Sequence, residues 1–386
     1  MFLDRIAGNT ILVGGTNGKG SVVALLESIY LAAGYSVGSY TSPHLLHYNE
    51  RVHLGGVEVS DQQLCDAFNT VETARADTQL TYFEFGTLAA AHILQSQNHD
   101  VAILEVGLGG RLDAVNLFDA DVAIVTTVDI DHSDWLGEDR ESIGYEKAGI
   151  FRAGKPAICG DIAPPSSLVK TADDLGAELY VQGRDFSFDC EQLACRFHGG
   201  GLEWTGLPQP RLAGQHQRLN VASTLMAVAS LQPRLPVTRV QAIAAIAGTE
   251  MVARFQIVAT EPEVVLDVAH NPQAVRALAR TCGERAVKGR TIAVVGMMRD
   301  KAIAECLGAL GAMVDKWFLA SLPGPRGADA SVLADALLIS GIKEPHEQFA
   351  DVTMAYHAAL SHAKPEDRIL VFGSFVTVGA IMHALN

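Results

Sequence analysis

A glycine-rich loop near the start of the chain has the residue types that hold a phosphate group. Residues 14–21 read GGTNGKGS and stand between an apolar run, residues 11–13, and an amphipathic stretch, residues 22–33. This order predicts a strand, a glycine loop and a helix, in which backbone N–H groups and the positive end of the helix face an anion. Lys19 adds a mobile cation and Ser21 a hydroxyl group for a magnesium ion. A glycine-rich turn with no phosphate role is the alternative.

The loop departs from the common phosphate-binding pattern G-x-x-x-x-G-K-[ST], because Gly20 separates Lys19 from the hydroxyl residue. This insertion argues against an ordinary small GTPase or kinase. It matches the variant G-T-N-G-K-G-[ST], in which Thr16, Asn17 and Gly18 also belong to the predicted nucleotide-binding loop.

Six further motifs follow the glycine loop along the chain. They are Ser42-Pro43-His44-Leu45, TYFEFGT at residues 81–87, LEVGLGGRLDA at residues 104–114, Asp131-His132, EKAGI at residues 146–150, and DVAHNP at residues 267–272. Any one of them can arise by chance, but all seven together span nearly the whole chain. In this order they resemble the folylpolyglutamate synthase family of the Mur ligase superfamily, and most closely its bacterial branch that is also a dihydrofolate synthase.

The hydrophobic pattern predicts an α/β fold with a mostly parallel sheet. Apolar runs alternate with helical patterns, such as residues 61–75 and 87–97. The strands predicted in this part of the chain are residues 11–14, 37–40, 101–106, 122–128 and 156–159. Sites in such sheets lie beyond the carboxyl ends of the strands. We therefore expect the glycine loop, Ser42, Glu105 and His132 to meet at one edge.

The later part of the chain predicts a second, smaller α/β unit. Residues 180–210 indicate a small antiparallel element, and helices are predicted at residues 217–230 and 238–247. Further strands, separated by helices, are predicted at residues 264–268, 292–296, 317–320 and 369–372. We predict a Mur-ligase-like P-loop domain for ATP and pterin at residues 1–250, and a Rossmann-like domain with ATP and glutamate contacts at residues 251–386. A shared cleft is favoured over two unrelated domains.

Composition excludes several classes of protein. The chain has 386 residues, of which 48% are hydrophobic and 19% charged, so disorder is not expected. Its net charge is −15, and no cluster of Lys and Arg suggests a nucleic-acid partner. The six cysteines lack C-x-x-C or zinc spacing, which predicts buried free thiols in a reducing compartment. Without a signal peptide or a long apolar run, we expect a cytoplasmic monomer that contacts no membrane.

Magnesium prefers hard oxygen ligands, which Ser21, Ser42 and Glu105 supply. Glu105 follows four apolar residues, where an acid is costly to bury unless it is paired or metal-bound. A simple salt bridge is the alternative. The resemblance implies that His132 binds a second magnesium ion and that CO₂ carbamylates Lys147, which makes it a carboxylate-like ligand. Taken alone, His132 would be a loop histidine and Lys147 a solvent-facing lysine.

The resemblance also implies nucleotide and amino-acid contacts later in the chain. Arg254 is expected to reach the ATP phosphates, Asp267 the ribose and Asn220 the base. An interdomain salt bridge and a helix cap are the alternatives. His270 and Ser374 are the residues expected to meet the incoming L-glutamate.

Two segments match the pterin contacts of the family. They are Thr81, Tyr82, Phe83 and Glu84, followed by Leu112, Asp113 and Ala114. Phe83 is suited either to stacking on a flat ring or to core packing, and Asp113 to accepting ring N–H groups. Members of the family have some dozens of residues before the glycine loop that contribute to this site, whereas here the loop begins at residue 14. We therefore expect weak use of dihydropteroate.

The activity implied is ATP-dependent formation of an amide bond between L-glutamate and dihydropteroate or a reduced folate, through an acyl phosphate. Lys19 and Lys147 are expected to serve catalysis, with His270 and Ser374. Two alternatives stay open. One is another Mur-type amide ligase that acts on a nucleotide sugar, and the other is a nucleotide-switched binding protein.

Overall fold

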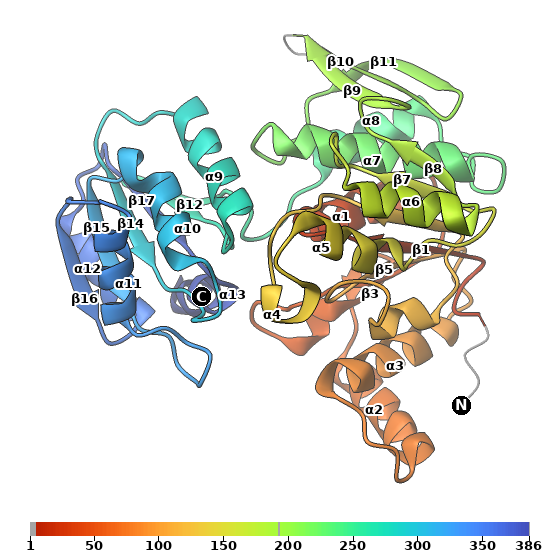
Figure 1. Cartoon of the computed structure of the whole chain (residues 1–386), viewed down its shortest axis with the longest axis horizontal. Coiled ribbons are helices and arrows are strands. Elements are labelled where there is room, and N and C mark those ends of the chain that lie inside the picture. Colours follow the sequence, from red (N-terminus) through yellow and green to blue (C-terminus); the bar gives the residue numbers. More distant parts are fainter. Residues whose placement is uncertain (1–4, 192–193, 386) are drawn as a thin grey trace. The chain divides into compact units, whose positions relative to one another are not determined.

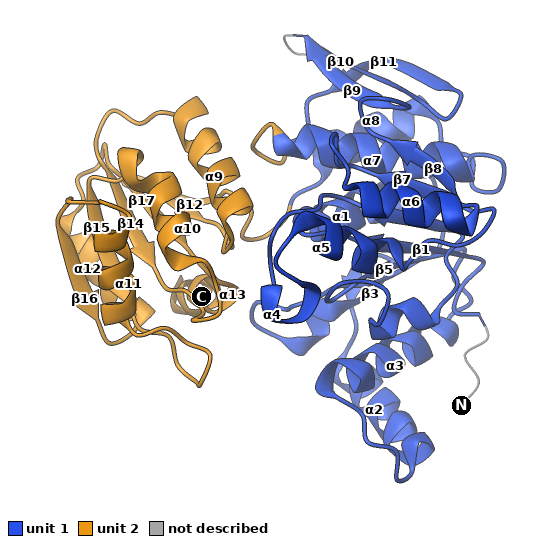
Figure 2. Ribbon diagram, in the orientation of Figure 1, with its two compact units in different colours: residues 1–211, 216–250 blue, residues 212–215, 251–386 orange. Residues whose placement is uncertain are grey.

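The chain divides into two compact units, which Figure 2 distinguishes by colour. The computed structural model describes residues 5–191 and 194–385. Unit 1 comprises the residues up to Arg211 together with His216–Glu250, and unit 2 comprises Leu212–Gln215 and the residues from Met251 onward. The short segment Leu212–Gln215 thus belongs to unit 2, although the sequence analysis places it in the first domain.

Unit 1 is built on an eight-stranded sheet with the order β4-β3-β2-β5-β1-β6-β7-β8 (Figure 1). The strands are β1 (Asn9–Gly14), β2 (Val37–Tyr40), β3 (Val52–Leu54), β4 (Val57–Glu58), β5 (Val101–Glu105), β6 (Val122–Val125), β7 (Pro156–Cys159) and β8 (Glu178–Val181). All neighbours from β2 to β8 pair in parallel, and only the β2–β3 and β3–β4 pairs are antiparallel. The predicted mostly parallel sheet is confirmed.

Helices cover both faces of this sheet. They are α1 (Lys19–Ala32), α2 (Asp61–Arg75), α3 (Tyr82–Gln95), α4 (Ser133–Leu136), α5 (Arg140–Ala148), α6 (Ser166–Leu175), α7 (His216–Leu231) and α8 (Arg239–Gly248), with 3-10 turns η1 (Tyr48–Arg51) and η2 (Ala114–Leu117). In β1, Leu12 joins a core with α2, α3, α5 and α6, whereas Ile11 and Val13 join a core with α1, α7 and α8. Side chains alternate along a strand, so a continuously apolar strand serves two cores.

A three-stranded antiparallel sheet, β9 (Ser187–Glu191), β10 (Ala194–Gly199) and β11 (Leu202–Pro208), shares its core with α7 and α8. Cys190 and Cys195 face each other in the β9–β10 ladder and form a disulfide, with Cα atoms 4.0 Å apart. The expectation of six buried free thiols is therefore wrong for this pair, because hairpin register cannot be read from cysteine spacing. It is also wrong for Cys65, which is free but exposed.

Unit 2 contains a six-stranded sheet with the order β12-β13-β17-β14-β15-β16. Its strands are β12 (Gln256–Thr260), β13 (Glu263–Leu266), β14 (Thr291–Val295), β15 (Lys316–Ala320), β16 (His346–Phe349) and β17 (Arg368–Phe372). Its helices are α9 (Pro272–Glu284), α10 (Ile303–Leu310), α11 (Ala330–Ile339), α12 (Val352–His362) and α13 (Phe375–Leu385), with the turn η3 (Gly311–Met313). Only β12 runs antiparallel. The sequence analysis missed the two edge strands, because most side chains of β12 and β16 are exposed and give no apolar pattern.

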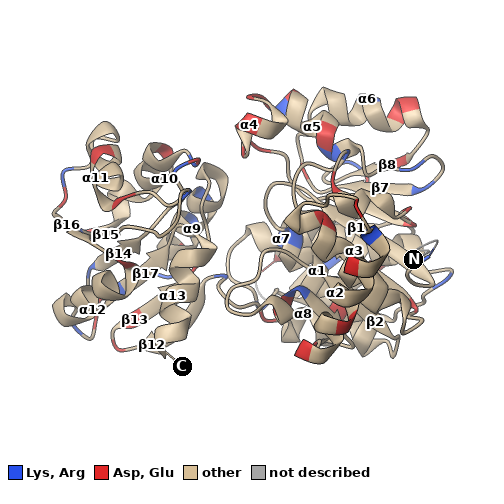
Figure 3. Cartoon of the chain, turned by 90° about the horizontal axis from the view of Figure 1, so that it is seen from below, with Lys and Arg blue, Asp and Glu red and all other residues tan. Residues whose placement is uncertain are grey.

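Figure 3 shows Lys and Arg scattered over both units, interspersed with the more numerous Asp and Glu. None of the helices in the described part of the chain has the length and apolar character needed to cross a bilayer.

Candidate active site

Four of the predicted site segments leave the carboxyl ends of adjacent strands in unit 1. The strands β2, β5, β1 and β6 are consecutive neighbours in the sheet. Ser42 follows β2, Glu105 ends β5, the glycine loop follows β1, and residues 126–132 follow β6. Val13 is paired with Glu105 and Gly14 with Val125, which aligns these strand ends. The edge lies where parallel α/β sheets place their ligands.

The glycine loop requires glycine at two positions for steric reasons. Gly15 has φ +136°, and a Cβ there would lie 1.9 Å from the hydroxyl oxygen of Thr126. Gly18, the N-cap of α1, has φ +90°, and a Cβ there would lie 2.4 Å from Oδ1 of Asn220. Residues with a side chain rarely adopt such φ values. The backbone can therefore turn tightly at the start of the helix, as a phosphate-binding loop needs.

Asn220, the expected contact to the nucleotide base, packs directly on this loop. It lies on α7, and its amide donates to Oε1 of Gln217 at 2.8 Å. Both side chains are buried, and Gln217 in turn contacts Nε2 of His216 at 3.2 Å. The structure thus brings Asn220 to the glycine loop and fixes its side chain there.

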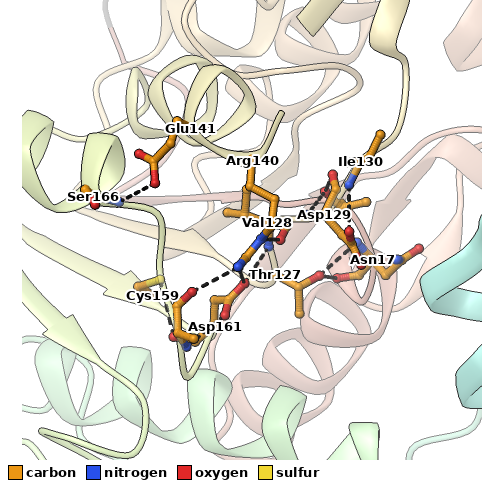
Figure 4. Close-up of polar contacts among 12 residues, drawn as sticks. Asn17, Thr127, Val128, Asp129, Ile130, Arg140, Glu141, Cys159, Asp161 and Ser166 are labelled. Carbon is orange, nitrogen blue, oxygen red and sulfur yellow. Dashed lines mark hydrogen bonds and ion pairs between the residues drawn. The ribbon is translucent and has the colours of Figure 1, made fainter. Parts of the chain in front are cut away.

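Hydrogen bonds join the glycine loop to the segment after β6. The backbone N–H of Thr16 donates to the carbonyl of Thr127 at 2.7 Å, and the N–H of Asn17 donates to the Thr127 hydroxyl at 3.2 Å. The Thr126 hydroxyl donates to the carbonyl of Asn17 at 2.6 Å. The Thr16 hydroxyl donates to the carbonyl of Asp129 and accepts from its N–H, each at 3.0 Å. The Thr16 side chain thus ties the glycine loop to the segment after β6. Figure 4 shows the neighbouring contact between Asn17 and Thr127.

Lys19 and Ser21 open helix α1. The Lys19 ammonium donates to the carbonyl oxygens of Gly15 and Thr16, at 3.1 and 3.3 Å, so it is folded over the loop. Ser21 is 2% exposed in the first turn of the helix. The loop thus presents a cation and a hydroxyl group beside a helix N-terminus, as the sequence predicts.

Glu105 and Ser42 fit a magnesium ion by their chemistry. Glu105 is buried at the end of β5, and its Oε2 accepts the backbone N–H of Ser42 at 3.1 Å. Within the described residues, no group of three or more His, Cys, Asp and Glu could hold a metal by itself. Magnesium usually combines one or two carboxylates with phosphate and water oxygens, so a full protein cage is not required.

His132 and Asp131 lie on the segment after β6. His132 is the N-cap of α4 and has a left-handed backbone, with φ +54°. Its N–H donates to Oδ1 of Asp131 at 2.9 Å, and its Nε2 lies 4.0 Å from the same oxygen. A left-handed backbone is unfavourable for a residue with a side chain. Such a backbone costs conformational energy that the surrounding structure must offset.

Lys147 is buried on α5 and is only 4% exposed, so it is not the solvent-facing lysine of the alternative interpretation. Burial, and after it the charge of Lys19, lower the pKa of its ammonium from 10.5 to about 7. Asp131 and Asp113 oppose this effect. These influences place Lys147 in the same electrostatic environment as the glycine loop and the Asp131-His132 motif.

The predicted pterin segments are well ordered. Thr81 and Glu84 form a capping box at the start of α3, so their side chains bind backbone N–H groups. Phe83 packs on Gly107, where a Cβ would lie 2.5 Å from the ring, and next to Tyr40 with ring centres 6.2 Å apart. The core-packing interpretation of Phe83 therefore has direct support.

Other side chains of these segments remain accessible. Tyr82 and Leu112 are 66% and 80% exposed. The oxygens of Asp113 accept the N–H groups of Leu108 and Val115, both at 2.9 Å, and burial raises the pKa of its carboxyl group. Asp113 thus shapes the loop that ends at Ala114, where η2 begins.

In unit 2, Asp267 stabilises the turn after β13. Its two carboxylate oxygens accept the N–H groups of Phe255 and Ala269, both at 2.8 Å. Burial raises the pKa of this carboxyl group, and the nearby charge of Arg254 opposes that rise. The Arg254 guanidinium lies over the ring of Phe375, 5.6 Å from its centre. Arg254 and Asp267 are therefore neighbours.

His270 and Ser374 lie beyond β13 and β17. His270 Nδ1 is 2.8 Å from the carbonyl of Val268. Ser374 is buried, and its hydroxyl oxygen accepts the N–H of Thr377 at 3.0 Å, which caps α13. Pro272 begins α9 with Asn271 as its N-cap.

Sequence reasoning missed three groups at the unit 1 site. The hydroxyl groups of Thr126 and Thr127 bind the glycine loop, and Asp161 binds the backbone of Val128 at 3.0 Å. Threonine pairs and a lone aspartate after a strand are common, so no local pattern singles them out. Polar residues directly after an apolar strand could have pointed to Thr126 and Thr127, whereas Gly160 separates Asp161 from the end of β7.

Comparisons with known proteins agree with this arrangement. Residues 13–160 match the Mur ligase middle domain, and residues 253–375 match the Mur ligase glutamate ligase domain. Dihydrofolate synthase/folylpolyglutamate synthase of Escherichia coli K12 is 44% identical over 97% of this chain and 86% of its own length. Folylpolyglutamate synthase of Lacticaseibacillus casei is 30% identical over 98% of this chain and 90% of its own length.

Solved structures give the same result. Escherichia coli FolC in complex with DHPP and ADP is 44% identical, with a TM-score of 0.93, over 99% of this chain and 90% of that one. The bifunctional folylpolyglutamate synthase/dihydrofolate synthase of Yersinia pestis, complexed with AMPPNP and Mn, is 44% identical, with a TM-score of 0.92. The match covers 99% of this chain and 90% of that one. Another structure of such a bifunctional synthase, with Mn, AMPPNP and L-glutamate bound, gives the same identity and TM-score, over 99% and 91%. The chain therefore belongs to the dihydrofolate synthase/folylpolyglutamate synthase family of Mur ligases.

Proposed function

We propose that this chain is an ATP-dependent ligase that attaches L-glutamate to dihydropteroate, giving dihydrofolate, and to reduced folates, extending their glutamate tails. The observation that carries the proposal is the alignment of the glycine loop, Glu105 and the Asp131-His132 segment at adjacent strand ends. Relatives with the same fold bind ADP or AMPPNP, DHPP and L-glutamate. The proposed activity belongs to folate biosynthesis, and its need for ATP suits a cytoplasmic location.

The reaction proceeds in two steps. The substrate carboxylate attacks the γ-phosphorus of ATP, which forms an acyl phosphate and releases ADP. The amine of L-glutamate then attacks the acyl carbon, and the tetrahedral intermediate expels inorganic phosphate and loses a proton. Lys19 and Arg254 are suited to neutralise the charge that builds up on the transferred phosphoryl group. His270 and Ser374 are the proposed contacts of L-glutamate, and Tyr82 and Leu112 offer exposed surface to the pterin substrate.

Two magnesium sites complete the proposal. Ser21, Ser42 and Glu105 would hold the first ion, and His132 with a modified Lys147 the second. When bound, magnesium neutralises phosphate charge and aligns the phosphoryl group for transfer. Of these residues, Ser42 and Glu105 lie at strand ends and Ser21 in the first turn of α1, and Lys147 supplies a buried amine.

Carbamylation of Lys147 is the finer part of the proposal. The neutral amine attacks CO₂, an N–C bond forms, and a proton is released, which leaves a carbamate with two oxygen acceptors. Burial of Lys147 favours the neutral amine that this step needs. A buried cation next to magnesium would be repelled, whereas a carbamate is the type of ligand that magnesium prefers.

The test is incubation with ATP, L-glutamate and either dihydropteroate or tetrahydrofolate, with products identified by mass. The proposal expects ADP release that requires both the pterin substrate and L-glutamate, and a product heavier by one glutamate residue. ATP hydrolysis that is independent of both substrates would instead indicate a nucleotide-switched binding protein. ATP turnover that starts only with a nucleotide-sugar acceptor would indicate another Mur-type ligase.

A further inference from the structure

The peptide groups around Val128 are held by an ion pair that the proposed reaction does not use directly. The backbone N–H of Val128 donates to Oδ2 of Asp161 at 3.0 Å, and its carbonyl accepts Nε of Arg140 at 2.8 Å. Arg140 and Asp161 also contact each other, at 2.8 Å between Nη2 and Oδ2. Figure 4 shows this closed ring of three residues, which come from the ends of β6 and β7 and the start of α5.

The ion pair supplies hydrogen bonds to the Val128 peptide groups, which lie beyond the end of the β6–β7 pairing. The β6–β7 pairing stops at Val125 and Cys159, and Gly160 still donates to the carbonyl of Val125 at 2.8 Å. Beyond this point the strands no longer pair. Val128 is 1% exposed, and a buried peptide group without a partner is costly. Asp161 and Arg140 supply the missing acceptor and donor.

The residues on either side of Val128, Thr127 and Asp129, bind the glycine loop. Thr127 accepts from the N–H groups of Thr16 and Asn17, and Asp129 exchanges two hydrogen bonds with the Thr16 hydroxyl. The segment is thus fixed on one side to the nucleotide-binding loop and on the other to Arg140 and Asp161. Because successive residues are hydrogen-bonded to the two sides in turn, the backbone of the residues that follow has little conformational freedom.

Arg140 also connects this segment to the helix of Lys147. It is the first residue of α5, and Lys147 lies seven positions later, about two helical turns or ~10 Å along the axis. His132 lies four residues beyond Val128. One guanidinium group therefore links the segment that leads to His132 directly to the helix that carries Lys147.

We propose that Arg140 and Asp161 are positioning residues for divalent-metal binding, which act by fixing the segment of His132 against the helix of Lys147. This inference rests on the proposed function, because it takes His132 and Lys147 as the metal-binding residues. Neither Arg140 nor Asp161 is proposed to touch metal, nucleotide or substrate. Groups that orient metal ligands commonly change metal affinity about 10- to 100-fold when they are altered.

The test compares the variants Arg140→Lys, Arg140→Gln and Asp161→Asn with the wild type. Lysine keeps the charge but cannot bridge the Val128 carbonyl and Asp161 in the same fork geometry, and asparagine keeps the shape of Asp161. Glu141→Gln is the matched control. Glu141 is the neighbouring residue on α5, and it ties the helix to Ser166 and Ser167 at 3.0 and 2.7 Å without contacting residues 127–129.

Mn²⁺ binding is measured by electron paramagnetic resonance in the presence of AMPPNP, together with the thermal midpoint of each variant. We expect the three variants to bind Mn²⁺ about 10-fold more weakly and to require correspondingly more Mg²⁺ for half-maximal ligation. The KM for L-glutamate of the three variants should stay near the wild-type value. The Mn²⁺ affinity of the control Glu141→Gln should also stay near that of the wild type. Rescue of turnover by added Mg²⁺ should be stronger for Arg140→Lys than for Arg140→Gln.

The outcomes separate this inference from the proposed function. If the wild type binds no Mn²⁺ with AMPPNP, both the proposed function and the inference fail. If the wild type binds Mn²⁺ and folded variants bind it equally well, only the inference is refuted, and Arg140 and Asp161 are purely structural. A loss of Mn²⁺ affinity in Glu141→Gln equal to that of the variants would also refute it, because any disturbance of α5 would then suffice.

Discussion

Replacing Lys147 by methionine should stabilise the protein while it abolishes ligation. The pKa of the buried Lys147 ammonium falls from 10.5 to about 7. Each pKa unit corresponds to about 1.4 kcal/mol, so the 3.5-unit depression amounts to at most about 5 kcal/mol of unfavourable burial at pH 7. Methionine has a similar length and no charge, and it suits a site that is 4% exposed.

The sign of the pH dependence follows from proton binding. Between pH 7 and 10.5, the unfolded chain holds the Lys147 proton and the folded chain does not, so wild-type stability rises with pH. The methionine variant lacks this pH-dependent contribution to the free energy of unfolding. Its advantage in the free energy of unfolding should therefore shrink from at most about 5 kcal/mol at pH 7 to about 2 kcal/mol at pH 9.

The assay is urea unfolding in CO₂-depleted buffer without nucleotide, at pH 7 and pH 9. Tryptophan fluorescence and circular dichroism are followed together, because a chain with two units need not unfold in a single transition. Lys170→Met is the matched control, since it removes a 73% exposed lysine side chain from α6 in the same unit. A Lys147→Met advantage that does not change between the two pH values, or a variant less stable than wild type at pH 7, would refute the reasoning.

Further predictions concern the glycine loop, unit 2 and CO₂. Lys19→Ala should lower ligation by ~100-fold or more with little change in Tm, and near-normal turnover would rule out a phosphate role. Gly18→Ala should raise the KM for ATP because its Cβ would meet Asn220, whereas Gly34→Ala, with φ +87° and open space, should leave KM unchanged. Arg254→Ala and Asp267→Ala should each raise the KM for ATP or lower kcat, and unchanged kinetics would exclude unit 2 from nucleotide turnover. Activity should fall in CO₂-depleted buffer and return with bicarbonate, and Lys147→Ala should be partly rescued by acetate. Full activity without CO₂ would exclude the carbamate.

The sequence predicts the central strands well because their composition is uniform. The predicted strands at residues 37–40 and 156–159 match β2 and β7 residue for residue, and the helical pattern at residues 61–75 matches α2. The strand predicted at residues 122–128 is wrong at its end, because β6 stops at Val125. From Thr127 onward, the hydrogen bonds of the backbone go to the glycine loop, to Asp161 and to Arg140 instead of to a neighbouring strand.

Other features of the site depend on tertiary contacts that no local pattern contains. The motif around Lys147 predicts a helix, but its burial follows from how α5 lies on the sheet. Likewise, the pairing of Arg140 with Asp161 joins residues 21 positions apart through the Val128 peptide. A resemblance to a family can name the ligands of such a site, whereas the residues that hold those ligands in place emerge only from the fold.

Several features that oppose local stability lie at the same edge of the unit 1 sheet. Gly15 and Gly18 have backbones that exclude side chains, His132 is left-handed, and Glu105 and Lys147 are buried ionisable groups. Each costs free energy on its own, by about 1–3 kcal/mol for backbone strain and more for a buried charge. Conflicts of this kind are expected to be scattered and few in a sequence selected for folding alone. Such features are not confined to this edge, since Ala76, Asn98 and Phe255 also have positive φ. Those beyond the four adjacent strand ends are the ones that the proposed nucleotide and metal site would explain, and a ligand that binds only the folded chain would then stabilise it.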